Sequence, residues 1–271
     1  MSSQPEYVFP RDFHDNNRIN LQHYQWVQLF GYHLNPQIPT GNPNLRIADV
    51  GTGTGIWLTD LSTRLPTTAK LEGLDISLEA LPPLDLVPSN VSFRQFDIKK
   101  DIPEELIGVY DVVHIRLFVF VLLDDEVPAA VRQLAKLLKP GGYLQWGELD
   151  VTSWRIETTN PNGKTEALSR LNDLLRKHDT RLVPTWIPQL EKLLKDAGLH
   201  NVQVDKRNAT GSLAFSMHEC TMMIGEDLSR ANSSTALSRE LQQVMSDVAS
   251  ETRDGAWWAM TRWTVVANKP L

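Results

Sequence analysis

The sequence is poor in features that would assign it to a membrane or an oxidising compartment. It holds one cysteine, Cys220, so no disulfide can form within the chain. The residues from Met1 to Glu6 have neither the basic start nor the apolar core of a signal peptide. The longest apolar run, Leu117 to Leu123, is far shorter than the roughly 20 residues that a membrane helix needs. These absences favour a cytoplasmic protein that does not enter a membrane.

Basic residues are also in the minority. The 27 lysines and arginines face 33 aspartates and glutamates, which gives a formal net charge of −6. Binding along a phosphate backbone requires basic surface to release counterions, so we expect no nucleic-acid partner. Ligand spacings such as His-x-x-x-His and clusters of cysteine are missing, so we expect no catalytic metal. The Gly-x-Ser-x-Gly turn of serine hydrolases is missing as well.

What the chain does contain is a glycine-rich turn after an apolar strand, in which three glycines alternate between Asp49 and Gly55. Glycine lacks a Cβ, so the backbone can turn tightly and a ligand can approach it closely. Ile56 follows where a phosphate-binding loop would place lysine, and the third glycine comes one residue too early for a dinucleotide fingerprint. The Asp49 carboxylate repels phosphate but suits an ammonium or a sulfonium. The loop therefore predicts S-adenosylmethionine as the cofactor.

The segment Asp49-Val50-Gly51-Thr52-Gly53-Thr54-Gly55 resembles the first motif of class I S-adenosylmethionine-dependent methyltransferases. Four later segments are similar to further motifs of that family in the same order, at 70–76, 93–98, 110–116 and 138–144. The resemblance implies that Asp75 binds the ribose hydroxyls and that Asp97 accepts from the adenine amino group. It implies cofactor contacts for Asp49, Gly51, Thr52, Gly53, Gly55, Asp75, Ile76, Asp97, Ile98, Arg116 and Arg18. Arg116 either touches the methionine carboxylate or pairs with a nearby acid.

Two further stretches resemble one group within this family. Residues 137–148, and an N-terminal region with Phe9 to Asp12 and Arg18 to His23, resemble the fungal secondary-metabolism methyltransferases related to LaeA, the UMTA-like group. This implies a small-molecule acceptor, a secondary metabolite. The resemblance to LaeA leaves open a non-catalytic regulator or partner-binding protein, and the fold leaves open an enzyme that does not transfer the methyl group. The region after Asp150 is largely unmatched, so the acceptor is not identified.

Strand and helix patterns alternate from residue 45 to residue 148. We predict strands at 45–50, 70–76, 91–97, 110–116 and 142–148, with helices at 55–64 and 126–138. This order predicts a doubly wound α/β fold that binds ligands at the carboxyl ends of its strands. The resemblance implies a Rossmann-like methyltransferase fold with seven strands, mostly parallel, and an antiparallel last strand, which we place at 261–267.

The remaining segments predict helices outside this core. We expect a first helix at 15–34, capped by Asn16 or Asp15, within an N-terminal helical lid of residues 1–44. The methyltransferase domain then covers 45–271, with helical insertions near 155–195 and 212–255 that are candidates for a substrate lid. These contain predicted helices at 164–177, 187–197, 217–224 and 235–253, and a strand at 201–205 lies between them.

The chemistry implied is direct displacement, in which an oxygen, nitrogen or sulfur of the acceptor attacks the methyl group. Holding the two reactants in line supplies most of the catalysis, so a base is optional. His23 and Glu148 are the candidate bases, and Tyr24 and Trp146 are candidate acceptor contacts. His23, Glu148 and Trp146 each have a structural alternative: a hydrogen-bonded core histidine, a solvated glutamate at a strand end and a packed tryptophan. The sequence decides neither the acceptor atom nor the oligomeric state.

Overall fold

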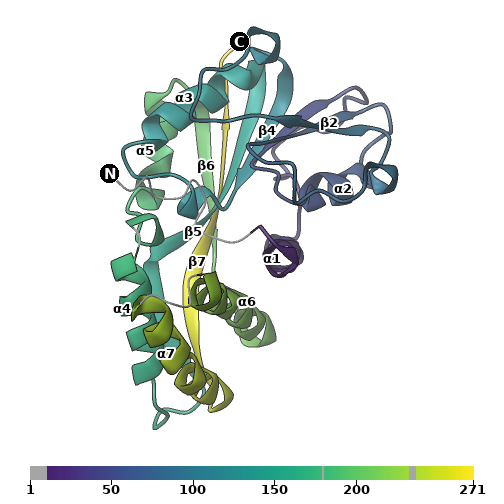
Figure 1. Ribbon diagram of the computed structural model, residues 1–271. Helices are drawn as coiled ribbons and strands as arrows, with labels where there is room; N and C mark the ends of the chain where they lie inside the picture. Colours follow the sequence, from purple (N-terminus) through teal and green to yellow (C-terminus); the bar gives the residue numbers. More distant parts are fainter. Residues whose placement is uncertain (1–10, 179, 232–235) are drawn as a thin grey trace.

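A seven-stranded sheet in the order β3-β2-β1-β4-β5-β7-β6 is the framework of the chain (Figure 1). The computed structural model describes residues 11–178, 180–231 and 236–271. The strands are β1 (Arg46–Val50), β2 (Lys70–Asp75), β3 (Val91–Gln95), β4 (Tyr110–Arg116), β5 (Leu138–Thr158), β6 (His200–Arg207) and β7 (Ala256–Asn268). Only the pairs that involve β7 are antiparallel in this sheet. The predicted α/β fold with an antiparallel last strand is confirmed.

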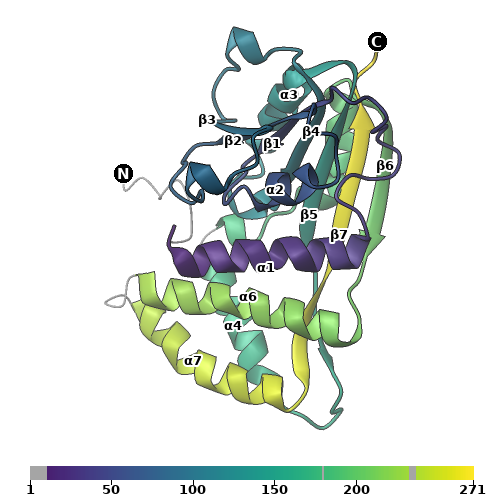
Figure 2. The same ribbon diagram turned by 90° about the vertical axis from the view of Figure 1, so that its right-hand side faces the viewer.

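Helices cover both faces of the sheet. On one face lies α2 (Ile56–Ser62), and on the other lie α3 (Val127–Leu137) and α5 (Leu190–Asp196) (Figures 1 and 2). Neighbouring residues of β1 point to different faces: Ile47 belongs to the core under α2, while Ala48 and Val50 belong to the core under α3. Burial on both faces explains why the strand reads as a continuous apolar run.

The first helix, α1 (Phe13–Phe30), begins earlier and ends earlier than predicted. Its N-cap is Asp12 rather than Asp15 or Asn16, because the Asp12 carboxylate accepts hydrogen bonds from the backbone N–H groups of His14 and Asp15. The helix ends at Gly31, whose φ of 73° is the left-handed conformation that glycine adopts at helix ends. Residues 1–10 of the predicted lid, including Phe9 and Pro10, lie outside the described residues.

The strands β5 and β7 are much longer than predicted. After a register shift they pair again, with residues 155–158 of β5 beside residues 256–259 of β7. Around this extension pack the insertion helices α4 (Glu166–His178), α6 (Gly211–Ala231) and α7 (Ala236–Arg253) (Figure 1). In Figure 2, α6 lies alongside α1, between α1 and α7. The division into a lid and a methyltransferase domain stays a prediction.

Short 3-10 turns complete the described structure, at Leu84–Leu86, Glu104–Leu106, Phe118–Phe120, Thr180–Leu182 and Ile187–Gln189. The turn at Phe118–Phe120 follows β4 directly and shapes the site described below. Within the described residues, no helix is both long and apolar enough to cross a membrane.

Candidate functional site

A cavity of about 190 Å³ opens beyond the carboxyl ends of β1, β2 and β4. This is the switch point of the sheet, where the chain order reverses between β1 and β4. The structure brings together there all the predicted cofactor residues except Gly55: Asp49, Gly51, Thr52, Gly53, Asp75, Ile76, Asp97, Ile98, Arg116 and Arg18. Arg18, Ile19 and Gln22 of α1 form a further part of the cavity wall. We call it the cofactor cavity.

The glycine loop fits closely against aromatic rings. A Cβ on Gly51 would lie 2.1 Å from Cε2 of Phe118, so this position tolerates no side chain. Gly55 has a φ of 72° at the start of α2, and a Cβ there would lie 2.8 Å from Cζ of Phe93. Gly55 therefore serves the packing of the turn and not the wall of the cavity.

The Asp75 carboxylate joins the end of β2 to the glycine loop. One oxygen accepts from the Gly53 N–H at 2.8 Å, and the other accepts from the Ser77 N–H at 3.1 Å. Burial raises the pKa of Asp75, although these two donors oppose the shift. Each carboxylate oxygen has a second lone pair, so the group can still receive hydroxyl donors from the cavity.

Asp97 both lines the cavity and stabilises the following turn. Its carboxylate accepts from the Lys99 N–H at 3.0 Å and lies 3.4 Å from Nζ of Lys100. The structural and the functional interpretations of this residue are thus compatible.

Asp49 places an acidic group at the base of the cavity. Its two oxygens accept from the Thr52 hydroxyl at 2.8 Å and from His114 Nδ1 at 2.7 Å. The His114 ring stacks on Trp57 with centroids 3.8 Å apart, and its burial lowers its pKa. A neutral His114 adds no positive charge to that of Arg116 near Asp49, and an acidic group in the cavity wall suits a cationic ligand.

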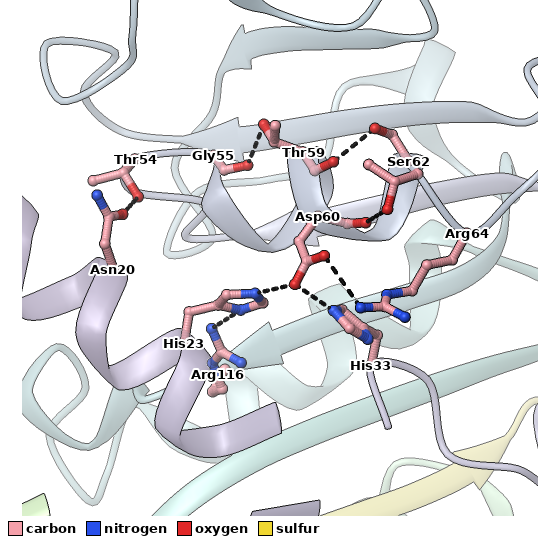
Figure 3. Close-up of polar contacts among 11 residues, drawn as sticks. Asn20, His23, His33, Thr54, Gly55, Thr59, Asp60, Ser62, Arg64 and Arg116 are labelled. Atoms are coloured by element: carbon pink, nitrogen blue, oxygen red, sulfur yellow. Dashed lines mark hydrogen bonds and ion pairs between the residues drawn. The ribbon is translucent and has the colours of Figure 1, made fainter. Parts of the chain in front are cut away.

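His23 lies outside the lining of the cofactor cavity, in a hydrogen-bonded group that ties α1 to α2 (Figure 3). Its Nε2 lies 2.9 Å from Oδ2 of Asp60, and Nε2 of His33 lies 2.6 Å from the same oxygen. Arg116 donates to Nδ1 of His23 at 3.2 Å, and a guanidinium cannot accept, so the ring proton of His23 is on Nε2. We call His23, His33 and Asp60 the α1 latch.

The latch geometry does not fit the predicted role of His23 as a base. Burial, and then the charge of Arg116, lower the pKa of His23 to about 4. Both ring nitrogens are engaged, the side chain is fully buried, and His23 is absent from the lining of the cofactor cavity. His23 is therefore placed to position α1 and Arg116.

The same three residues have the chemistry of a metal site, since one ligand atom from each lies within 4.8 Å of the others. A metal-bound histidine normally donates its second ring N–H to an acceptor. Here Nδ1 of His23 faces a guanidinium donor, which fixes the proton on the nitrogen that a metal would need. The arrangement fits a hydrogen-bonded latch better than a metal centre.

The predicted roles of Glu148 and Trp146 do not fit their positions either. Both are fully buried in the core and lie outside the cofactor cavity. One Glu148 oxygen accepts from the Phe118 N–H at 2.9 Å and from Trp146 Nε1 at 3.1 Å, and the other accepts from the Leu149 N–H. Burial raises the pKa of Glu148 to about 7 against these donors. Glu148 thus holds the turn after β4 in place. Tyr24, the other predicted acceptor contact, is 56% exposed on α1.

That turn supplies residues that sequence reasoning missed. Leu117 has a φ of 58°, which costs energy for a branched side chain, and it directs Phe118 over Gly51. Leu117, Phe118 and Phe120 line the cofactor cavity. In the sequence this apolar run indicated buried structure, and no spacing signalled a ligand wall.

A second, smaller cavity of about 20 Å³ lies on the other side of this turn. It shares Gln22, Leu117 and Phe120 with the cofactor cavity. Its further lining comes from α1, β5, α6 and β7: Gln25, Trp26, Leu149, Met217, Thr221, Ile224 and Arg262. We call it the α6 slot.

The comparisons with known proteins agree on one family. A methyltransferase-domain family model matches residues 22–204. The chain is 37% identical over 179 residues to methyltransferase grgD of a Penicillium species, which covers 64% of this chain and 60% of that protein. It is 30% identical to N-methyltransferase gliN of Aspergillus fumigatus over 74% of this chain and 70% of the relative. It is 32% identical to the secondary metabolism regulator laeA of Gibberella zeae, over 54% of this chain and 46% of the regulator.

The matches span between about half and two thirds of the length of most of these relatives. Among solved structures, phosphoethanolamine N-methyltransferase 2 of Haemonchus contortus in complex with S-adenosyl-L-methionine has a TM-score of 0.52 at 16% identity, covering 94% of this chain and 57% of that one. The cyclase SpnF also has a TM-score of 0.52, at 15% identity over the full length of both chains. These likenesses show the fold alone. By the match of its sequence, the chain belongs to the methyltransferase-domain family, in the group that includes fungal secondary-metabolism methyltransferases and LaeA regulators.

Proposed function

We propose that the protein binds S-adenosylmethionine and transfers its methyl group to a small-molecule acceptor. The observation that carries this proposal is the cofactor cavity, where an acid lies at each of three strand ends around a glycine loop. Asp49 suits the cationic part of the cofactor, Asp75 the ribose hydroxyls and Asp97 the adenine amino group. Among the described residues, Arg116 and Arg18 are two of the four cationic residues that line the cavity, with Arg11 and Lys99, and they suit the methionine carboxylate.

The cofactor supplies a sulfonium with a methyl group that a nucleophile can displace. When the acceptor attacks, the sulfur–methyl bond breaks, a bond from methyl to oxygen, nitrogen or sulfur forms, and any proton on the acceptor atom leaves to solvent. The protein holds the two reactants in line and excludes water with α1 and the turn at Phe118, both of which line the cavity. Relatives named N-methyltransferases favour nitrogen as the acceptor atom.

A general base is not required by this arrangement. The predicted bases, His23 and Glu148, have their polar atoms engaged by Arg116 and Asp60, and by backbone N–H groups and an indole. We therefore assign both as positioning residues: His23 for α1 and Arg116, and Glu148 for the turn that carries Phe118.

The alternatives are a regulator that keeps the fold and an enzyme that does not transfer the methyl group. The similarity to the laeA regulator is the reason for the first alternative, and the fold shared with the cyclase SpnF is the reason for the second. Incubation with cofactor labelled in the methyl group and an extract of candidate acceptors separates them. A labelled product whose mass equals that of an acceptor with one labelled methyl group in place of a hydrogen supports the enzyme, whereas tight cofactor binding with no labelled product supports a regulator.

Cofactor choice itself is tested by calorimetry. We expect S-adenosylhomocysteine to bind and NAD not to bind, because Asp49 disfavours a pyrophosphate beside the loop. Stronger heat from NAD than from S-adenosylhomocysteine would contradict the proposed function.

A further inference from the structure

The α6 slot contains an arginine whose charge is not balanced. Arg262, on β7, lies opposite Leu149 of β5 and Arg207 of β6 in the strand register. Its Nη1 donates to the carbonyl oxygen of Met260 at 3.2 Å. Among the residues that the structure describes, it forms no ion pair with a carboxylate, whereas its neighbour Arg207 pairs with Asp205 at 2.9 Å.

The environment of Arg262 makes this imbalance costly. Burial lowers its pKa to about 10, and the ionisable group that opposes this shift is the thiol of Cys220. Burial in turn raises the pKa of Cys220 to about 11, so the thiol is neutral at pH 7 and supplies no counter-charge. Arg262 is part-buried, and a charged group with a shifted pKa and no carboxylate partner that lines a cavity is a candidate for a ligand site.

The rest of the slot is apolar and small. Trp26, Leu149, Met217 and Ile224 line the slot together with Arg262, and the hydroxyl of Thr221 already donates to the Met217 carbonyl at 2.9 Å. A volume of about 20 Å³ admits one small polar group and not a whole acceptor. A planar monoanion matches the fork of a single guanidinium, while a phosphate dianion needs more donors than this wall offers.

The position of the slot connects it to the reaction. Gln22, Leu117 and Phe120 form a wall common to the α6 slot and the cofactor cavity. The two cavities therefore lie next to each other, with Arg262 in one and the predicted cofactor residues in the other.

We propose that the α6 slot is the recognition site for a carboxylate of the acceptor, with Arg262 as its binding residue. This rests on the proposed function, and it narrows the acceptor to small molecules that carry a carboxylate beside the methylated atom. Acceptors in which that group is an amide or an ester bind weakly.

The test uses phenylacetate and its neutral match phenylacetamide, added to the full chain in the presence of S-adenosylhomocysteine. We expect phenylacetate to raise the melting temperature and phenylacetamide not to do so, because a ligand that binds the folded state stabilises it. Arg262→Met should lower the affinity for phenylacetate at least tenfold. The control is Arg155→Gln, which removes a positive charge of β5 that pairs with Glu157 outside both cavities and should leave phenylacetate binding unchanged.

Two further readouts separate a binding role from a structural one. Without added ligand, Arg262→Met should melt at the same or a higher temperature than the wild type, because it removes a part-buried positive charge that no carboxylate among the described residues balances. A lower melting temperature together with unchanged phenylacetate affinity would overturn the proposal, as would stabilisation by inorganic phosphate but not by phenylacetate. Calorimetry with S-adenosylhomocysteine should give equal affinities for both proteins, and a failure of that titration in the wild type would count against the proposed function instead.

Discussion

At the scale of single residues, most side chains around the cofactor cavity serve the fold and the ligand together. Asp75 accepts from the backbone of the glycine loop, Asp97 caps a turn, and Asp49 holds His114 and Thr52. A carboxylate has room for several donors, so one group can fix the backbone and still face the cavity. The removal of such a group should weaken cofactor binding more than the loss of one contact would suggest.

Asp75→Ala should lower the affinity for S-adenosylhomocysteine at least tenfold. It removes charge-assisted hydrogen bonds worth roughly 1.5 to 3 kcal/mol each and also frees the Gly53 N–H. Isothermal titration calorimetry measures the effect, with circular dichroism as the control for folding. Equal affinity in a folded variant would show that another acid binds the ribose.

Glu148 should make stability depend on pH. Its pKa is about 7 in the folded protein against the usual 4.5, so between these values the folded state keeps a proton that the unfolded state has lost. The free energy of unfolding should therefore fall as pH rises from about 4.5 to about 7, by roughly 2 to 4 kcal/mol. His23 and His218, with pKa values of about 4, act in the opposite direction as pH rises to about 6.5.

Urea unfolding of the wild type and of Glu148→Gln across this range isolates the glutamate, because both proteins keep the histidines. We expect the difference in unfolding free energy between the two to shrink or reverse with rising pH. A constant difference would mean that Glu148 does not titrate in this range.

At the scale of elements, the α1 latch determines how the first helix sits on the sheet. Burial raises the pKa of Asp60, but the hydrogen bonds from His33 and His23 outweigh it and lower the pKa overall. Next to the latch, Gly147 of β5 leaves room for α1, since a Cβ there would lie 2.9 Å from Cζ2 of Trp26. The helix is thus seated by hydrogen bonds at one point and by close packing at another.

Asp60→Ala should loosen α1 without unfolding the sheet. It leaves the buried N–H of His23 without an acceptor, which costs about 1 to 3 kcal/mol. We expect faster hydrogen exchange in α1 and weaker binding of S-adenosylhomocysteine, because Arg18 and Gln22 of α1 line the cavity. Arg64→Ala is the matched control, since it removes only an exposed partner of Asp60 at 3.6 Å and should change little. Unchanged exchange in Asp60→Ala would show that packing alone seats the helix.

Many of the helices and strands could be predicted from the sequence, because the spacing of apolar residues that indicates them lies within a short segment. The strand at 110–116 and the helices near 126–138 and 235–253 lie within a residue or so of the structure. The length of β5 could not be predicted, since residues 155–158 pair with a partner about a hundred positions away. The latch was hidden for the same reason: His23 was visible on α1, but Asp60 and His33 come from other segments. The role of Arg262 could not be predicted from the sequence, because its lack of a carboxylate partner depends on which residues surround it in the fold.

At the scale of the whole molecule, the cofactor cavity and the insertion helices come from different parts of the chain. Among the described residues, none after Val121 lines the cofactor cavity, whereas the α6 slot takes residues from α6 and β7. Of the predicted substrate-lid helices, α6 packs against α1 and contributes to the slot. Variation in those helices can change the acceptor while the cofactor cavity stays the same.

The net charge leads to a prediction for the intact protein. With a formal charge of −6, the chain should not be retained by duplex DNA or heparin at physiological salt, because it has few cations to release counterions. Affinity chromatography tests this, with a basic protein of similar size as the positive control. Retention that weakens steeply with added salt would reveal a local basic surface.

The continuous β5 and β7 strands have a consequence for engineering this protein. Both strands run from the seven-stranded sheet into the extension around which α4, α6 and α7 pack, so two strands connect these parts of the molecule (Figure 1). A graft that exchanges the extension as a module would have to cut both strands. New acceptor preferences are therefore best sought by replacing side chains on α6 and β7 in place, with the backbone kept whole.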